Sequence, residues 1–300
     1  MTTAPDDDHV AAPHADLPSI PTLVSVEPIG TERYRGVSPL HWPGHRVFGG
    51  LVAAQALRAA GSTVTDLLPH SFHAYFLRLG RPHLPLDHTV TRIRDGRSFA
   101  TRLVEVAQAG EVIFTMLASF HRREPGEDYQ VARAADAPLP ETDDGSTGAV
   151  LPHLAALTDL VVRDLGPTEP GPDGTFRSTR RMWLRVRGPL PDDPLLHATI
   201  VTLMSDMGIV TAARPPATPL AWDLVMAASL DHAVWFHRPI RADDWILYDL
   251  HSLSVSGARA IARGVMHSLS GSLGASVTQE ALVRTNSTIS RPTWGDRPEV

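Results

Sequence analysis

The strongest constraint on the fold is a pattern that occurs twice in the 300 residues, an apolar helix followed by a run of short strands. The stretch RVFGGLVAAQALRAAG, residues 46–61, carries apolar residues on nearly every helical face and therefore predicts a buried helix. Strand-like segments separated by tight turns then follow over residues 70–78, 86–93, 98–108 and 112–122. The sequence thus predicts a long buried helix followed by an antiparallel meander.

The second half repeats this order. A first strand is expected over residues 182–188 and a buried helix over 194–210, and further strands over residues 225–238, 245–255, 258–270 and 273–284. Residues 95–120 align with residues 256–281 without a gap, and turns and apolar positions keep step although few identities survive. Internal duplication explains this agreement, and two unrelated meanders of equal length are the alternative.

A helix wrapped by an antiparallel sheet, present twice in one chain, predicts an α+β protein with a double hotdog fold. Joining the two sheets edge to edge would hide strand edges that otherwise aggregate. The expected organisation is a disordered tail over residues 1–22, an N-terminal hotdog over 23–122, a Pro- and Gly-rich linker with a short helix over 123–180, a C-terminal hotdog with the catalytic residues over 181–286 and a tail over 287–300.

Composition excludes several kinds of chemistry. The chain has no cysteine, which excludes thiolate nucleophiles, Cys-based zinc sites and iron–sulfur clusters. It also has no lysine, so it cannot form a Schiff base with pyridoxal phosphate, and it has no P-loop lysine to bind phosphates. The net charge of -6 argues against a general nucleic-acid binder. No apolar run approaches about 18 residues, and the acidic, Pro-rich first residues lack the basic and apolar regions of a signal peptide, so a cytoplasmic protein is expected.

Asp206 is the first candidate for chemistry. It is the only acidic residue between Asp193 and Asp223, and it lies within the expected second helix among apolar neighbours. A carboxylate in such surroundings is costly unless it is paired or hydrogen-bonded. The alternative is that it faces the exposed end of the helix or caps a following turn.

Gln279 is the second candidate. Strand alternation places it on the apolar side of the last strand, toward the helix, where its carbonyl and NH2 groups both need partners. A neighbouring carboxylate and a water would suit it. A core amide that is satisfied by backbone groups is the alternative.

Ser229, Asp231 and His232 invite a hydrolase interpretation, but a local triad is not expected. On a regular strand Ser229 and Asp231 share one face and His232 points to the other, whereas a triad needs the imidazole between the hydroxyl and the carboxylate. No G-x-S-x-G motif is present. No H-E-x-x-H motif is present either, and no metal site is expected.

Six segments together resemble the acyl-CoA thioesterase II family, tandem-hotdog acyl-CoA hydrolases. They are RVFGG, HSFHAYFLRLG and RDGRSFATR in the first half, and SDMGIV, SLDHAVWFHRP and SVTQEALVR in the second. The resemblance runs from about residue 25 to residue 286. The combination of D-H-x-x-W-F-H with V-F-G-G and D-G-x-S-F is highly specific to the family, although any one motif alone would be weak.

The resemblance implies catalytic roles for three residues. In the family, an Asp on the second hotdog helix, a Thr or Ser at the start of the D-H-x-x-W-F-H strand and a Gln on the last strand bind and activate a water. These positions are Asp206, Ser229 and Gln279, with Ser where many members carry Thr. The implied reaction is hydrolysis of an acyl-CoA to a free fatty acid and CoA, with no bound cofactor.

The developing oxyanion also needs hydrogen-bond donors. We expect them to be the backbone N–H groups of Gly49 and Gly50, since the start of a helix favours negative charge. The alternative is that these glycines only permit a tight entry into the helix. Replacing Gly50 by Val is expected to cripple turnover and leave folding intact.

Two other functions remain open at this point. One is a hotdog protein that binds acyl-CoA without catalysis, and the other is a hotdog hydratase or dehydratase, which needs a His–acid pair facing the acyl chain. The expected partners are an acyl-CoA, with its phosphates held by Arg side chains, and further copies of the chain in a dimer or tetramer. Nucleic acid and membrane are not expected partners.

Overall fold

The computed structural model describes residues 18–38, 46–82, 84–140, 157, 159–172, 178–214 and 225–285. The helices and strands of the first half are α1 Ile20–Leu23, β1 Glu27–Gly30, β2 Arg33–Gly36, α2 Gly49–Gly61, β3 Leu68–Phe76, β4 Leu86–Asp95, β5 Phe99–Gln108 and β6 Glu111–His121. Those of the second half are β7 Leu160–Gly166, β8 Arg180–Val186, α3 Pro194–Ser205, α4 Ile209–Ala212, β9 Val225–Ser229, β10 Asp231–Phe236, β11 Ile246–Ser256, β12 Arg259–Ser268 and β13 Leu273–Thr285.

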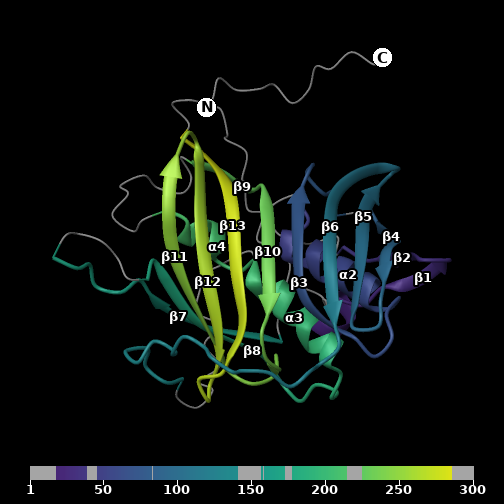
Figure 1. Cartoon of the computed structure of the whole chain (residues 1–300). Helices are drawn as coiled ribbons and strands as arrows, with labels where there is room; N and C mark the ends of the chain where they lie inside the picture. Colours follow the sequence, from purple (N-terminus) through teal and green to yellow (C-terminus); the bar gives the residue numbers. More distant parts are fainter. Residues whose placement is uncertain are drawn as a thin grey trace, which may run out of the picture.

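The described strands form one antiparallel sheet. Its order is β1-β2-β4-β5-β6-β3-β10-β13-β12-β11-β8-β7, and β9 pairs with β13 off this path. The two halves join where β3 pairs with β10, with Ala74 opposite His232 and Phe72 opposite Val234. Figure 1 shows β3 and β10 side by side at the centre of the sheet. The sheets of the two halves are therefore joined edge to edge, as predicted.

The turns of the two halves also correspond. The offset that aligns residues 95–120 with 256–281 matches Gly110, between β5 and β6, with Gly271, between β12 and β13. Both glycines have positive φ, of 81° and 90° respectively. This conformation suits glycine because a Cβ would be strained there. Equivalent glycines in equivalent hairpins favour internal duplication over two unrelated meanders.

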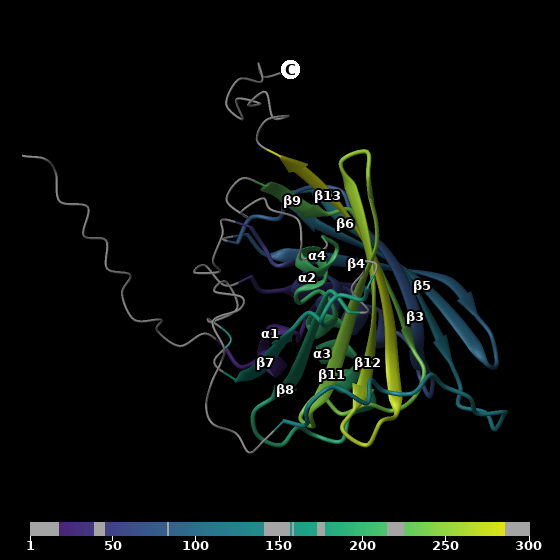
Figure 2. The same cartoon turned by 90° about the vertical axis from the view of Figure 1, so that its left-hand side faces the viewer.

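The long helices α2 and α3 pack together on one side of the curved sheet (Figure 2). Every residue of α2 except Gly49 and Arg58 is buried, which agrees with its apolar pattern. Arg58 near the end of α2 pairs at 3.0 Å with Asp193 at the start of α3. The helices therefore run antiparallel, and the start of α2 lies beside the end of α3. None of the helices in the described residues is long and apolar enough to cross a lipid bilayer.

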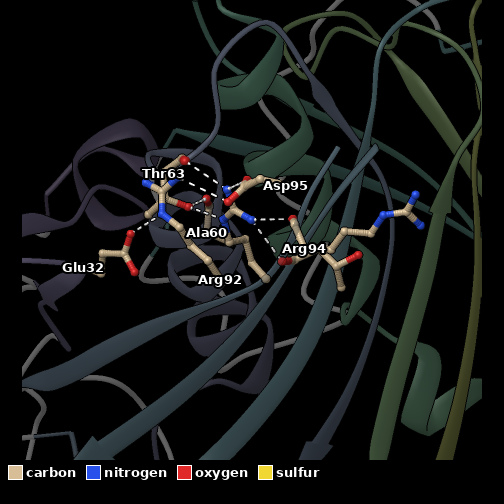
Figure 3. A network of polar contacts seen from close by, with 8 residues as sticks. Glu32, Ala60, Thr63, Arg92, Arg94 and Asp95 are labelled. Atoms are coloured by element: carbon tan, nitrogen blue, oxygen red, sulfur yellow. Dashed lines mark hydrogen bonds and ion pairs between the residues drawn. The ribbon is translucent and has the colours of Figure 1, made fainter. Parts of the chain in front are cut away.

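A network of polar contacts around a buried arginine holds the other end of α2 against the sheet; Figure 3 labels its members Thr63, Arg92 and Asp95. Arg102 of β5 is 1% exposed and donates to Thr63 Oγ1 at 2.7 Å and to Thr63 O at 3.2 Å. Arg102 also pairs with Asp95. Arg92 pairs with both Asp95 and Glu32 and so extends the network to Glu32. Because a buried guanidinium needs partners for its donors, this network fixes where α2 ends. The Arg-Asp-Gly-Arg segment, residues 94–97, thus has a structural role through Asp95, at a distance from the candidate site.

Two expectations about the tail and the linker are wrong in part. Residues 20–22 of the expected tail belong to α1, where Ile20 is buried and its N–H donates to Asp159 Oδ2 at 2.8 Å. The short helix expected in the linker covers the apolar segment VLPHLAALTDLVV, residues 150–162, but residues 160–162 are the start of β7, which pairs with β8. Short apolar runs inside Pro-rich sequence are ambiguous between helix, strand and loop, and tertiary contacts decide. Residues 1–17, 150–156 and 286–300 lie outside the described residues.

Candidate active site

The candidate site forms where the end of α3 meets the start of α2. The expected helix over 194–210 is interrupted, because α3 ends at Ser205 and Asp206 is its C-cap. Gly208, with φ 74°, then turns the chain into α4. Asp206 thus lies at the end of a helix, as in the alternative that placed it at an exposed helix end or at a following turn. It is nevertheless only 7% exposed.

Two donors from different parts of the chain hold the Asp206 carboxylate. The backbone N–H of Gly50, in the first turn of α2, donates to Oδ2 at 2.8 Å. The side-chain amide of Gln279, on β13, donates from Nε2 to Oδ1 at 3.0 Å. A buried carboxylate is tolerated when its oxygens accept such bonds. The predicted need for partners at Asp206 is met by a helix N-terminus and an amide.

Gln279 brings the third candidate into the cluster. It is 1% exposed on the inward face of β13, as strand alternation predicts. Its Nε2 also donates to Ser229 Oγ at 2.7 Å, so both amide hydrogens are in use. Its Oε1 accepts from the ring Nδ1 of His232. The interpretation of Gln279 as a core amide satisfied by backbone is therefore wrong.

The expected face of His232 is also wrong, and a bulge explains why. Ser229 ends β9 opposite Ala281, whereas Ala233 of β10 lies opposite Thr278, so one extra residue, Leu230, separates the two pairings with β13. A bulge of one residue reverses the alternation that follows it. Ser229 and His232 consequently both point to Gln279.

Asp231 points elsewhere, away from this cluster. Its Oδ1 accepts the backbone N–H of Glu280 at 2.7 Å. The local triad of Ser229, Asp231 and His232 is therefore not assembled, as expected.

The two glycines at the start of α2 permit a close approach between the helices. A Cβ on Gly50 would lie 2.7 Å from the carbonyl oxygen of Leu203, in the backbone of α3. A Cβ on Gly49 would lie 2.9 Å from Asp206 Oδ2. The N–H of Gly50 is taken by Asp206, which leaves Gly49 as the candidate oxyanion donor. A valine at position 50 would meet the backbone of α3, so we now expect Gly50→Val to lower the stability of the fold as well as turnover.

Burial sets the protonation of the cluster. It raises the pKa of Asp206 from 3.8 to about 6, against the hydrogen bonds from Gln279 and Gly50, which lower it. It lowers the pKa of His232 from 6.5 to about 4, against the hydrogen bond with Gln279. Near neutral pH the site therefore contains a carboxylate that can accept a proton and a neutral imidazole.

A cavity of 380 Å³ opens onto this cluster. Asp206, Ser229 and Gly49 form its polar wall. Its apolar wall includes Val52, Phe76, Ile113 and Phe114. The exposed side chains of Arg46 and Arg78 lie at its rim. The cavity thus combines an apolar surface, a buried carboxylate and a cationic edge, which suits a ligand with an apolar arm and an anionic head.

A second cavity, of 440 Å³, lies near the start of α3 and the start of β3. His70, His121 and His197 line it, and its carboxylate, Asp192, has a side chain that is 95% exposed. It has no counterpart of the buried carboxylate–amide–hydroxyl cluster. The first cavity is therefore the candidate active site. No cluster of three metal-ligating side chains occurs in the part of the chain that the structure describes.

Comparison with known proteins agrees with this geometry. Residues 38–121 match the family model of the acyl-CoA thioesterase N-terminal domain, and residues 131–283 match that of the C-terminal domain. The chain belongs to the acyl-CoA thioesterase family. This is a family of thioester hydrolases, and the resemblance seen in the sequence is confirmed.

Individual relatives extend over nearly the whole chain. A crystal structure of an acyl-CoA thioesterase II from Mycobacterium marinum is 39% identical, with a TM-score of 0.76 over 90% of this chain and 100% of that one. Human acyl-coenzyme A thioesterase 8 is 30% identical over 310 residues, 93% of each chain. A protein with a hot dog fold from Alicyclobacillus acidocaldarius has a TM-score of 0.69 over 88% of this chain and 97% of that one, at 20% identity, and shows the fold alone.

Proposed function

We propose that this chain hydrolyses acyl-CoA thioesters to a carboxylic acid and CoA, with a water activated by Asp206. The observation that carries the proposal is the buried Asp206 carboxylate, hydrogen-bonded by Gln279, which also holds Ser229 at the wall of the cavity. Family membership supports the reaction class. The roles of the three side chains are inferred from their contacts.

The donors and acceptors that each side chain uses, and those it keeps free, indicate its role. Gln279 uses both amide hydrogens on Asp206 and Ser229, so it orients these two side chains. Ser229 Oγ accepts from Gln279 and keeps its own hydrogen for a water at the cavity wall. Each Asp206 oxygen retains a lone pair, which accepts a proton from the same water. The water is then held by a donor and an acceptor, with a lone pair directed at the thioester carbon.

The reaction then balances over two steps. The water oxygen forms a bond to the thioester carbon as Asp206 takes one water proton, and the carbonyl oxygen becomes an oxyanion. When the oxyanion collapses, the C–S bond breaks and the CoA sulfur takes the proton from Asp206. A carboxylate with a pKa of about 6 suits both transfers near neutral pH. General-base assistance of this kind contributes about 10²–10⁴-fold in rate.

Substrate binding follows from the walls of the cavity. The N–H of Gly49, in the first turn of α2, is our candidate donor to the oxyanion. The apolar wall around Phe76 and Phe114 receives the acyl chain. Arg46 and Arg78 at the rim pair with CoA phosphates, although Arg78 already contacts Val112 O at 2.7 Å and Glu111 at 2.6 Å.

We extend the proposal to the organisation of the chain as a double hotdog. The units are residues 23–122 around α2 and residues 181–286 around α3, with the linker over 123–180 adding β7 to the edge of the second sheet. The continuous sheet and the matched turns support this division.

A homo-oligomer, a dimer or a tetramer, is the proposed assembly, and light scattering on the purified chain tests it. Exposed apolar side chains on the outer face of the sheet, Tyr75 and Leu117, support it.

A thiol-release assay tests the function directly. Because the protein has no cysteine, a thiol reagent detects only released CoA. The proposal predicts stoichiometric CoA and free acid from an acyl-CoA, with one 18O atom in the acid when the reaction runs in labelled water. Tight binding without CoA release would instead support a binding protein. Hydration of an enoyl-CoA with the thioester left intact would support a hydratase.

A further inference from the structure

A fourth side chain, His232, completes the hydrogen-bonded cluster without reaching the cavity. It lies on β10, at the junction of the two halves, and is 0% exposed. Its Nδ1 contacts Gln279 Oε1, and its Nε2 lies 2.7 Å from Ser205 Oγ. Its ring centroid is 5.8 Å from that of Phe72, which packs beside it. His232 therefore contacts the side chain that orients Asp206 and Ser229.

The contacts of Gln279 require one orientation of its amide. Nε2 must face Asp206 Oδ1 and Ser229 Oγ, since a carbonyl oxygen in that place would oppose the carboxylate. Oε1 then faces His232 Nδ1 and needs a donor. With the amide reversed, the carboxylate would lose a donor and an N–H group would oppose the ring N–H. A proton on His232 Nδ1 therefore selects the working orientation of Gln279.

Gln279 Oε1 can only accept, so a neutral His232 ring carries its proton on Nδ1, and Ser205 faces the other ring nitrogen. A neutral imidazole with Nδ1–H has an unprotonated Nε2, which accepts the hydrogen of Ser205 Oγ, 2.7 Å away, when the hydroxyl turns toward the ring. Ser205 Oγ also lies 2.8 Å from Thr202 O, a second acceptor for the same hydrogen. Tyr248 OH donates to Ser205 O at 2.6 Å and holds the end of α3 in place. The chain of contacts runs from Ser205 through His232 and Gln279 to Asp206.

We propose that His232 is a positioning residue that fixes the amide orientation of Gln279 and thereby holds Asp206 and Ser229 in the arrangement that activates water. This inference rests on the proposed hydrolysis for its kinetic consequence. The orientation itself is a structural statement that is measured without turnover.

Loss of the His232 donor has a predictable effect on the pH dependence of the reaction. A free Gln279 amide leaves Asp206 with one donor fewer, which disfavours the ionised form and raises its pKa. Among the described residues, Tyr248 of β11 interacts electrostatically with Asp206, and Arg46 and Arg78 line the same cavity. None of them is altered by a change at position 232. His232 itself, with a pKa of about 4, stays neutral across the limb that Asp206 controls.

Two substitutions separate positioning from packing. His232→Leu removes the donor, whereas His232→Asn places an amide nitrogen on Cγ, where Nδ1 is attached in histidine. Both lose the ring and its contact with Ser205. The control is His88→Asn, since His88 on β4 is equally buried, at 1% exposure, and neither ring nitrogen has a partner among the described residues.

The kinetic experiment compares the three variants in the thiol-release assay from about pH 5 to about pH 9. His232→Leu should lower kcat by roughly 10–100-fold with little change in KM, and should move the acid limb of kcat/KM to higher pH. His232→Asn should recover most of kcat and restore the limb. His88→Asn should keep wild-type kinetics. Equal losses in the Leu and Asn variants with an unshifted limb would overturn the inference.

A spectroscopic measurement keeps the inference testable even if the wild type releases no CoA, an outcome that rejects the proposed function alone. In 15N-histidine NMR spectra of the intact chain, the His232 signals are those absent from His232→Asn. The inference predicts a neutral ring with Nδ1 protonated and Nε2 unprotonated at pH 7. A ring protonated at Nε2 alone would contradict it.

Discussion

The backbone N–H of Gly50, at the start of α2, donates a 2.8 Å hydrogen bond to Oδ2 of Asp206, at the end of α3. This bond joins the two halves of the chain beside the cavity that Asp206 lines. The positive end of α2 stabilises the carboxylate that burial disfavours. The contact requires the two antiparallel helices to approach closely, and this approach explains the glycine pair in the sequence.

A side chain at either glycine should therefore impair the site. In Gly50→Ala the new Cβ meets Leu203 O at 2.7 Å, so α2 must shift, and we expect a loss of stability of about 1–3 kcal/mol with reduced kcat. In Gly49→Ala it meets Asp206 Oδ2 at 2.9 Å, and we expect turnover to fall more than stability. Thermal unfolding and CoA release measure the two effects.

Gly126→Ala is the matched control for both glycine variants. A Cβ at Gly126 has nothing within 4 Å, and the residue has no positive φ. We expect wild-type stability and turnover. A Gly50→Ala variant as active and as stable as this control would contradict the close approach of α2 and α3.

The hydroxyl at position 229 should matter more than the size of its side chain. Ser229→Ala removes the acceptor for Gln279 Nε2 and the donor to the water, and we expect kcat to fall by roughly 10–100-fold. Ser229→Thr keeps the hydroxyl, so we expect kcat within about threefold of the wild type. Steady-state kinetics of CoA release decide between these values. An active Ala variant would show that Ser229 does not hold the water.

Asp206 should also make stability depend on pH. Its pKa is about 6 in the folded chain against 3.8 ordinarily, so the folded state binds the proton more tightly than the unfolded state. The contribution of this group to stability is then highest below about pH 4 and falls as the pH rises through about 6, by roughly 3 kcal/mol in all. The buried carboxylate therefore destabilises the fold at neutral pH.

The comparison of wild type with Asp206→Asn isolates this effect, because asparagine does not titrate. Calorimetric Tm values at intervals from about pH 4 to about pH 8 should shift in favour of the variant as the pH rises. The other titrating groups are common to both proteins. A constant Tm difference across this range would contradict the raised pKa of Asp206.

The sequence predicted those parts of the fold that depend on regular patterns. The repeated apolar helix, the strands after it and the inward side of β13 follow from spacing alone, so Gln279 was placed correctly. Asp206 stood out because a carboxylate among apolar residues needs a partner. The spacing of residues in the sequence could not identify Gly50 as that partner, because Gly50 and Asp206 come together only when α2 packs against α3.

The features that the sequence missed are local irregularities. The extra residue at Leu230 reverses strand alternation, and His232 therefore points into the cluster rather than away from it. The left-handed turn at Gly208 ends α3 earlier than the apolar pattern indicates. The bulge has no clear signature in one sequence, whereas the Asp-Met-Gly segment at the end of α3 carried a C-cap signal that the apolar run obscured.

The most direct test of the account is the kcat of Asp206→Asn in the thiol-release assay. The account predicts a fall of about 10²–10⁴-fold in kcat with KM nearly unchanged. Asp249→Asn, which changes another buried carboxylate outside the cavity, is the control and should retain turnover. Undiminished CoA release by a folded Asp206→Asn variant would contradict the assignment of Asp206 as the base.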